Sequence, residues 1–241
     1  MQTEAPRINI DRLMNRIDTL AGIGAVAGGG VCRLALSDED RQGRDLVARW
    51  MRDLGLAVTT DRIGNLVGIR SGSEARPPVL TGSHIDTVVT GGRYDGSLGV
   101  LAGLEVIATL NEAGITTRKP LGVAFFTNEE GARFAPDMMG SGVHQGFLDL
   151  EEMLDIRGID GRRVGDALAE IGYAGMEPVG SFRADSYLEL HVEQGPVLEQ
   201  DRFTIGAVEG VQGISWTESR VTGTSNHAGT TPMHLRRDAG Y

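Results

Sequence analysis

Apolar residues recur at every third or fourth position in two segments of the N-terminal region. In residues 9–20 they are Ile10, Leu13, Met14, Ile17 and Leu20. This spacing places them on one face of an α-helix. A second apolar stripe follows Ser37, which forms an N-terminal helix signal together with Glu39 and Asp40. Gly55 ends this stripe, so we predict two amphipathic helices in this region.

Five short runs, rich in apolar and β-branched residues, have the length of β-strands. They are Ala57–Thr60, Leu66–Ile69, Val79–Gly82, Leu121–Phe126 and Tyr187–Leu190. Three segments between them have an apolar helical pattern: Ser97–Leu110, Leu150–Leu154 and Val164–Ile171. Strands that alternate with helices are typical of an α/β domain. We therefore predict that the fold class is α/β, a largely parallel sheet with flanking helices.

The pattern changes near Val211. Residues 214–221 alternate apolar and polar side chains like an exposed strand, and Pro232 has the position of a first helical residue. We therefore predict two domains. Residues 1–210 form the first, and residues 211–241 begin a second, smaller α+β domain.

The formal net charge of −10 at pH 7 argues against a surface that binds nucleic acid or anionic lipid through clustered positive charge. The one cysteine, Cys32, excludes an internal disulfide and a zinc site built from thiolates. Residues 1–12 contain no signal-peptide core, and no window approaches the ~18 apolar residues needed to cross a bilayer. We predict a cytoplasmic protein without a nucleic-acid or membrane partner.

Predicted strands lead directly into side chains that bind divalent metals. His84 follows the third strand, Asp95 lies in the glycine-rich turn after it, and His191 follows the fifth. Parallel strands present their carboxyl ends at one edge of a sheet, where ligands bind. Two imidazoles and one carboxylate leave a coordination position open on a four-coordinate zinc, as in a catalytic site.

The fourth strand leads into a pair of adjacent carboxylates, Glu129 and Glu130. Successive side chains at a strand end point to opposite sides, so one can bind a metal while the other acts as a general base. Asp86 lies two residues after His84 and is placed to accept the free ring N–H of that histidine. Taken alone, each of these motifs could equally consist of ordinary surface residues in contact with water. Three such strand ends together favour a metal site.

Five motifs follow one another within residues 82–238. They are Gly82-Ser83-His84-Ile85-Asp86, Asp95-Gly96, Asn128-Glu129-Glu130-Gly131, Glu189-Leu190-His191-Val192-Glu193-Gln194-Gly195 and Asn226-His227-Ala228-Gly229-Thr230-Thr231-Pro232-Met233. Together they resemble the M20 metallohydrolases, most closely the amidase/hydantoinase/carbamoylase branch. That branch includes N-carbamoyl-L-amino acid hydrolases, β-ureidopropionases and allantoate amidohydrolases.

The resemblance implies a zinc-peptidase-like catalytic domain that is interrupted by a smaller lid and dimerisation domain. It also implies two divalent metal ions, zinc or manganese. By motif position, His84 and His191 bind one ion and Glu130 binds the other, and Asp95 bridges the two. Glu129 is then the general base, which takes a proton from the attacking water and hands it to the leaving nitrogen.

Three further residues are assigned to the substrate by the resemblance. Gln194 matches a position that contacts the ureido group, although a turn amide bonded to the backbone is an equal alternative. Gln212 lies where the lid domain begins, at the expected rim of the pocket, and ordinary packing is its alternative. His227 matches a lid histidine that stabilises the tetrahedral intermediate, often from the partner subunit of a homodimer.

The resemblance therefore implies a hydrolase of the C–N bond of a ureido group, with an N-carbamoyl-L-amino acid hydrolase as the first hypothesis. Residues 213–216 favour it over allantoate amidohydrolase, the second hypothesis, and an M20 aminopeptidase or deacylase ranks third. Family members are longer, and their remainder supplies a late histidine to the ion of Glu130. We therefore expect residues 1–241 to be a fragment with one complete ion site. A chain that binds one metal without turnover is the non-enzymatic alternative.

Overall fold

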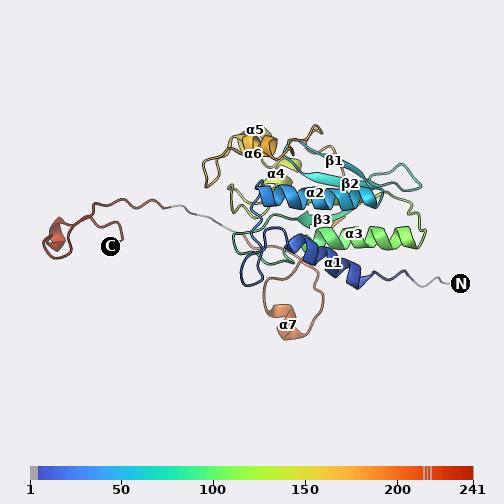
Figure 1. Cartoon of the computed structure of the whole chain (residues 1–241), viewed down its shortest axis with the longest axis horizontal. Coiled ribbons are helices and arrows are strands. Elements are labelled where there is room, and N and C mark those ends of the chain that lie inside the picture. Colours follow the sequence, from blue (N-terminus) through green and yellow to red (C-terminus); the bar gives the residue numbers. More distant parts are fainter. Residues whose placement is uncertain (1–4, 214, 216, 218, 241) are drawn as a thin grey trace. The chain divides into compact units, whose positions relative to one another are not determined.

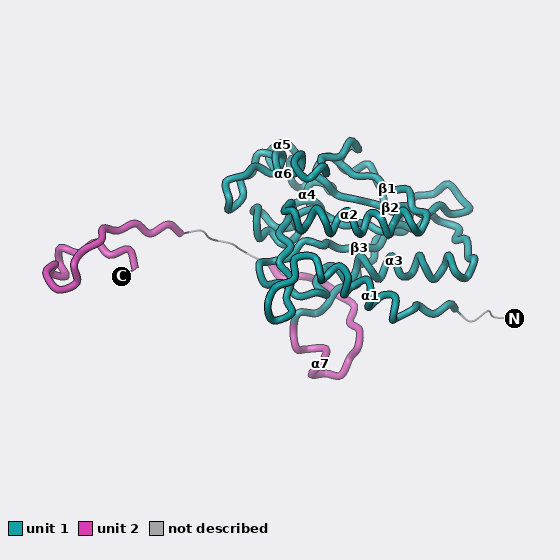
Figure 2. Tube along the Cα trace, viewed as in Figure 1, with its two compact units in different colours: residues 1–194 teal, residues 195–241 magenta. Residues whose placement is uncertain are grey.

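The computed structural model (Figure 1) describes all residues except 1–4, 214, 216, 218 and 241. It divides into two compact units, unit 1 with residues 1–194 and unit 2 with residues 195–241 (Figure 2). The boundary between residues 210 and 211 stays a prediction. Among the described residues, no helix is long and apolar enough to cross a membrane.

Unit 1 is built on a five-stranded sheet with the strand order β1-β2-β4-β3-β5. The strands are β1 (Ala57–Thr60), β2 (Leu66–Arg70), β3 (Val79–His84), β4 (Leu121–Phe126) and β5 (Ser186–Leu188). β4, β3 and β5 are parallel, whereas β2 runs antiparallel to both β1 and β4. The predicted α/β fold is confirmed. The sheet as a whole is mixed, because a short turn joins β1 and β2 as a hairpin.

Three helices lie side by side on one face of the sheet (Figure 1): α1 (Ile10–Ala21), α2 (Asp38–Asp53) and α3 (Ser97–Glu112). Asn9 and Ser37 cap the first two helices by accepting backbone N–H groups of the first turn, at 3.0 and 3.2 Å. α3 approaches the strands closely at Gly103, where a Cβ would lie 2.6 Å from the Thr81 side chain. The apolar faces of these helices and the strands form the main core.

Three short helices build a second core: α4 (Met139–His144), α5 (Leu150–Asp155) and α6 (Val164–Glu170). Phe134, Ile63 and Leu168 are fully buried among them. The sequence pattern predicts α5 and α6 but not α4. Two of the six residues of α4 are glycine, so it lacks both an apolar period and helix propensity.

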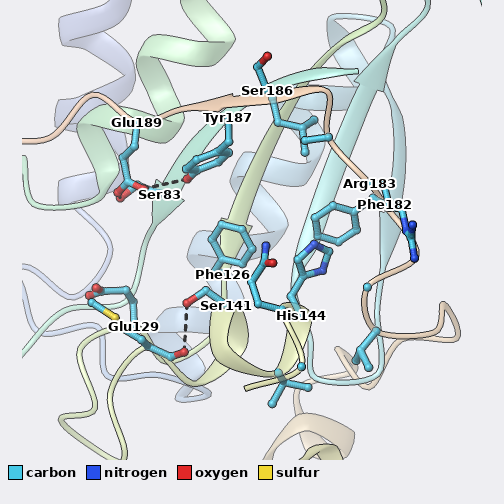
Figure 3. A pocket seen from close by; sticks show the side chains of 18 of the residues that line it. Ser83, Phe126, Glu129, Ser141, His144, Phe182, Arg183, Ser186, Tyr187 and Glu189 are labelled. Carbon is cyan, nitrogen blue, oxygen red and sulfur yellow. Dashed lines mark hydrogen bonds between the residues drawn. The ribbon is translucent and has the colours of Figure 1, made fainter. Parts of the chain in front are cut away.

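The opposite face of the sheet is only partly covered. Leu80 and Ala124 are buried there, with Phe182 packed against them. Beside them lies a cavity of about 1000 Å³, whose walls are rich in aromatic side chains (Figure 3). The cavity reaches Ser83 and Glu129, so it borders the carboxyl ends of β3 and β4.

Unit 2 contains the short helix α7 (Val197–Asp201) and a 3₁₀ helix (Met233–Leu235). The helix predicted from Pro232 onward is present only as that 3₁₀ turn. Of the strand predicted over residues 214–221, positions 214, 216 and 218 lie outside the described residues. The remaining positions of that segment form no strand.

Candidate metal centre

β3 ends in His84, whose side chain is only 2% exposed. Its ring Nδ1 lies 3.0 Å from the main-chain oxygen of Asp86. A carbonyl oxygen can only accept, so Nδ1 carries the hydrogen and Nε2 presents a free lone pair. The prediction that the Asp86 carboxylate accepts this N–H is therefore wrong, because the main-chain oxygen of the same residue does so. The carboxylate lies 3.9 Å from Nδ1, because it is bonded elsewhere.

His191, three residues beyond β5, has the same arrangement. Its Nδ1 lies 2.8 Å from the Val192 main-chain oxygen, so Nε2 is again the free nitrogen. Both Nε2 atoms approach Asp95 Oδ1, that of His191 at 3.3 Å and that of His84 at 3.8 Å. Lone pairs and a carboxylate oxygen repel one another at these distances unless a cation or a proton lies between them.

These three residues fit a divalent cation. Their ligand atoms all lie within 4.8 Å of one another. Two ligand atoms at roughly 2.0–2.1 Å from one tetrahedral zinc lie roughly 3.3 Å apart, close to the two nitrogen–oxygen distances observed here. An imidazole whose second nitrogen donates to a carbonyl is also the usual state of a metal ligand. His84, Asp95 and His191 therefore form a candidate metal-binding triad.

Asp86 holds Glu129 and Glu130 next to this triad. Its buried carboxylate accepts the backbone N–H groups of both glutamates, each at 3.2 Å. After β4, Asn128 takes a left-handed conformation with φ 53°, which asparagine tolerates better than most residues. The glutamates thus follow a turn and do not continue the strand. Glu129 Oε2 lies 3.4 Å from His84 Nε2, within reach of a water at the triad.

The carboxylates around the triad carry unbalanced negative charge. Burial raises the pKa of Glu130 to about 7, and His84 opposes this shift while Asp95 adds to it. Burial also raises the pKa of Glu129, again opposed by His84. Burial lowers the pKa of His84, but Asp86 and Glu129 raise it by more. A bound cation would neutralise this charge, which supports the same assignment.

Glu130 lies outside the group of three, although the sequence predicts it as a ligand. Its Oε1 is buried and has no hydrogen-bond partner among the described residues. Buried carboxylate oxygens normally have partners, so this atom is available to a ligand. Its role as a ligand stays a prediction.

The residues predicted to contact substrate fall into two places. Gln194 takes a left-handed conformation after His191, and its Nε2 donates to Asp95 Oδ2 at 2.6 Å. The structure thus places Gln194 at the triad. Gln212 and His227 belong to unit 2 and are exposed there, and His227 Nδ1 accepts the Gly229 N–H at 3.1 Å. Their roles toward substrate stay predictions.

Two buried arginines support the site and are missing from the sequence-based prediction. Arg33 donates to three main-chain oxygens, those of Leu20, Ile23 and Ile85. It thereby fixes the turn that follows His84. Arg44 donates to Thr127 Oγ1 at the end of β4, at 3.2 Å. A charged residue inside an apolar run, as Arg33 is within residues 31–36, must be buried with polar partners, and that signal could have identified it.

Gly96→Ala is expected to weaken metal binding about tenfold or more, the scale seen when residues that orient ligands are changed. Gly96 has φ 58°, and an added Cβ would lie 2.4 Å from Nε2 of His84, the atom that faces the triad. The ring must therefore move. Calorimetric titration with Zn²⁺ measures the effect. Gly92→Ala is the control, because a Cβ there meets nothing within 4 Å. Equal losses in both variants would contradict this account.

Comparisons with known proteins agree with the site. The sequence model of the peptidase family M20/M25/M40 matches residues 80–237, which contain all the predicted ligands. An N-carbamoyl-L-amino-acid amidohydrolase from Rhizobium meliloti is 44% identical over 98% of this chain and 57% of its own length. A ureidoglycolate hydrolase from Arabidopsis thaliana is 36% identical over 95% of this chain and 50% of its own length.

The crystal structure of a hydantoinase/carbamoylase family amidase from Burkholderia ambifaria is similar with a TM-score of 0.85 at 51% identity. The match covers 98% of this chain and 58% of that protein. The chain thus spans between 50% and 58% of the length of these three relatives. The resemblance predicted from the motifs is confirmed. Because the family model matches well over half of its residues, the chain belongs to the M20/M25/M40 peptidase family.

Proposed function

We propose that the protein to which this chain belongs is a metal-dependent amidohydrolase that cleaves the C–N bond of a ureido group. Its proposed substrates are N-carbamoyl-L-amino acids. The observation that carries the proposal is the convergence of two free imidazole nitrogens on Asp95, with the Glu129 carboxylate beside them. The activity in the name of the Rhizobium meliloti relative supports the substrate class.

The residues have distinct roles in this proposal. His84, Asp95 and His191 hold a divalent cation, zinc or manganese, which when bound would polarise the ureido carbonyl and lower the pKa of the attacking water. Glu129 accepts the proton of that water and transfers it to the leaving nitrogen as the C–N bond breaks. Asp86 keeps Glu129 in place through its backbone N–H. The products are an amino acid, ammonia and carbon dioxide.

Glu130 is proposed as a ligand of a second ion, with Asp95 shared between the two. Support comes from its buried Oε1, which lacks a partner among the described residues, and from its raised pKa of about 7. Both features would be relieved by a cation. The amide of Gln194, already bonded to Asp95, is proposed to contact the ureido group of the substrate.

Steady-state kinetics of the full-length protein test the proposed substrate. We expect kcat/KM on the best N-carbamoyl-L-amino acid to exceed that on allantoate and on ureidoglycolate by roughly tenfold or more, since a pocket shaped for one side chain discriminates at that level. Ureidoglycolate is included because one relative carries that activity in its name. A preference for either alternative substrate would reassign the substrate. Faster hydrolysis of dipeptides would overturn the ureido proposal.

A further inference from the structure

The two histidines of the triad come from neighbouring strands whose backbone pairing stops short of them. β3 and β5 pair in parallel at three positions, the last of which joins Thr81 to Leu188. If the same register continued, His84 would lie opposite His191. The two rings are 6.1 Å apart between centroids, so the strand ends remain neighbours at this point. A contact outside the backbone ladder must therefore set their spacing.

Glu189 makes such a contact (Figure 3). One of its carboxylate oxygens accepts the hydroxyl hydrogen of Ser83, the residue before His84. Its other oxygen accepts the hydroxyl hydrogen of Tyr187 at 2.9 Å. The Tyr187 ring in turn meets Phe126 edge-on at the end of β4, with 6.1 Å between centroids. The carboxylate thus connects the end of β5 to β3, and the tyrosine that donates to it contacts β4.

We propose that Glu189 is a positioning residue of the metal centre, which fastens β5 to β3 beyond their ladder and so fixes the distance between His84 and His191. We name the Ser83–Glu189 hydrogen bond the strand link. The proposal rests on the metal centre of the proposed function, but it does not depend on the substrate. Glu189 is not itself a member of the triad.

The strand link can affect the position of His191 strongly, because few other contacts hold β5 in the sheet. It is three residues long and exposed throughout, and it lies at the edge of the sheet, with β3 as its one neighbour among the described strands. Strand ends with few buried contacts open readily. Ser83 is 2% exposed, so its hydrogen bond to the carboxylate is shielded from water at one end and is charge-assisted. That bond is well placed to hold His191 in register.

Titration of the chain with Co²⁺, followed by calorimetry and by the visible absorption of the bound ion, tests the proposal. The unmodified chain is expected to bind the ion. Ser83→Ala and Glu189→Ala should each lower the affinity by about tenfold or more, which is the usual effect of replacing a residue that orients a metal ligand. Each should also shift the absorption band of the bound ion. The double variant should lose no more than either single variant, because both changes remove the same bond.

Two further variants separate the strand link from other roles. Glu189→Gln keeps an oxygen that accepts from Ser83, so it should retain most of the affinity. If Glu189 acted as a metal ligand or through its charge, Glu189→Gln would lose as much affinity for the ion as Glu189→Ala. Ser141→Ala is the matched control in the same cavity (Figure 3). Its hydroxyl bonds the Met138 oxygen on its own turn, at 3.1 Å, so its loss should not affect the ion.

The outcomes are distinct. Unchanged affinity in Ser83→Ala and Glu189→Ala, in a chain that binds Co²⁺, overturns the strand link and leaves the metal centre standing. Equal losses in Glu189→Gln and Glu189→Ala also overturn it. A parent chain that binds no Co²⁺ overturns the metal centre and this proposal together. If Glu189→Ala fails to fold by circular dichroism, Ser83→Ala and Glu189→Gln decide between these results.

Discussion

Glu129→Gln is expected to lower kcat of the full-length enzyme by roughly 10²–10⁴-fold, the usual contribution of a general base. Glutamine has nearly the same shape but cannot take a proton from water. Glu129 lies near the triad, 3.4 Å from His84 Nε2, but is not one of its three ligands. The metal content should therefore not change. KM should change little, since the lost interaction acts in the transition state. Steady-state kinetics on an N-carbamoyl-L-amino acid and atomic absorption measure the two effects.

The control for this experiment is Glu151→Gln. Glu151 lies on α5, where its exposed carboxylate pairs with Arg62 at 2.7 Å and has no role in the proposed mechanism. Its kcat should match that of the parent enzyme. A Glu129→Gln enzyme that keeps its kcat would remove Glu129 from the role of base. One that loses its metal would show that the residue is a ligand instead.

Arg44→Leu is expected to lower the free energy of unfolding by about 3–5 kcal/mol, the cost of leaving one partner of a buried ion pair alone. Its guanidinium is buried, with Nε 2.8 Å from Asp40 Oδ2. It also donates to the Gly64 oxygen at 2.8 Å and to Thr127 Oγ1 at 3.2 Å. Domains typically have about 5–15 kcal/mol of stability in total, so urea unfolding should detect the loss easily.

Arg41→Leu is the matched control on the same helix. Arg41 also pairs with an aspartate, Asp38, at 3.3 Å, but the two side chains are 43% and 78% exposed. Exposed pairs contribute about 0–1 kcal/mol, so this variant should unfold almost like the parent. Adding Asp40→Asn to Arg44→Leu should restore part of the stability, because the isolated charge is removed. Equal losses in the two arginine variants would contradict the argument.

The triad is predictable because each histidine follows a short run with the length and composition of a strand. His84 and His191 leave parallel strands at one edge of the sheet, and Asp95 lies in the turn that connects β3 to α3. Strand periodicity and metal-ligand chemistry are both local features of a sequence. Their combination therefore predicts which side chains meet, even without coordinates.

The supporting contacts could not be predicted in the same way, because their partners are main-chain atoms far away in the sequence. Asp86 accepts from the backbone of Glu129, and Arg33 donates to the backbone of Ile85. A backbone group leaves no signature in its residue type. β5 ends at Leu188, two residues before the predicted end, although β3 continues to His84. The residue at which β5 leaves β3 depends on contacts between distant segments, so it has no local signature either.

The distribution of the triad along the chain also has a kinetic consequence. His84 and Asp95 lie at the two ends of the short segment between β3 and α3, so they come together as soon as these elements form. His191 follows β5, which is much later in the sequence. Pairings between distant segments pay the entropy of loop closure first and form slowly. Uptake of the ion should therefore lag behind helix formation during refolding. Once bound, the cation would hold the last strand in place and slow its release.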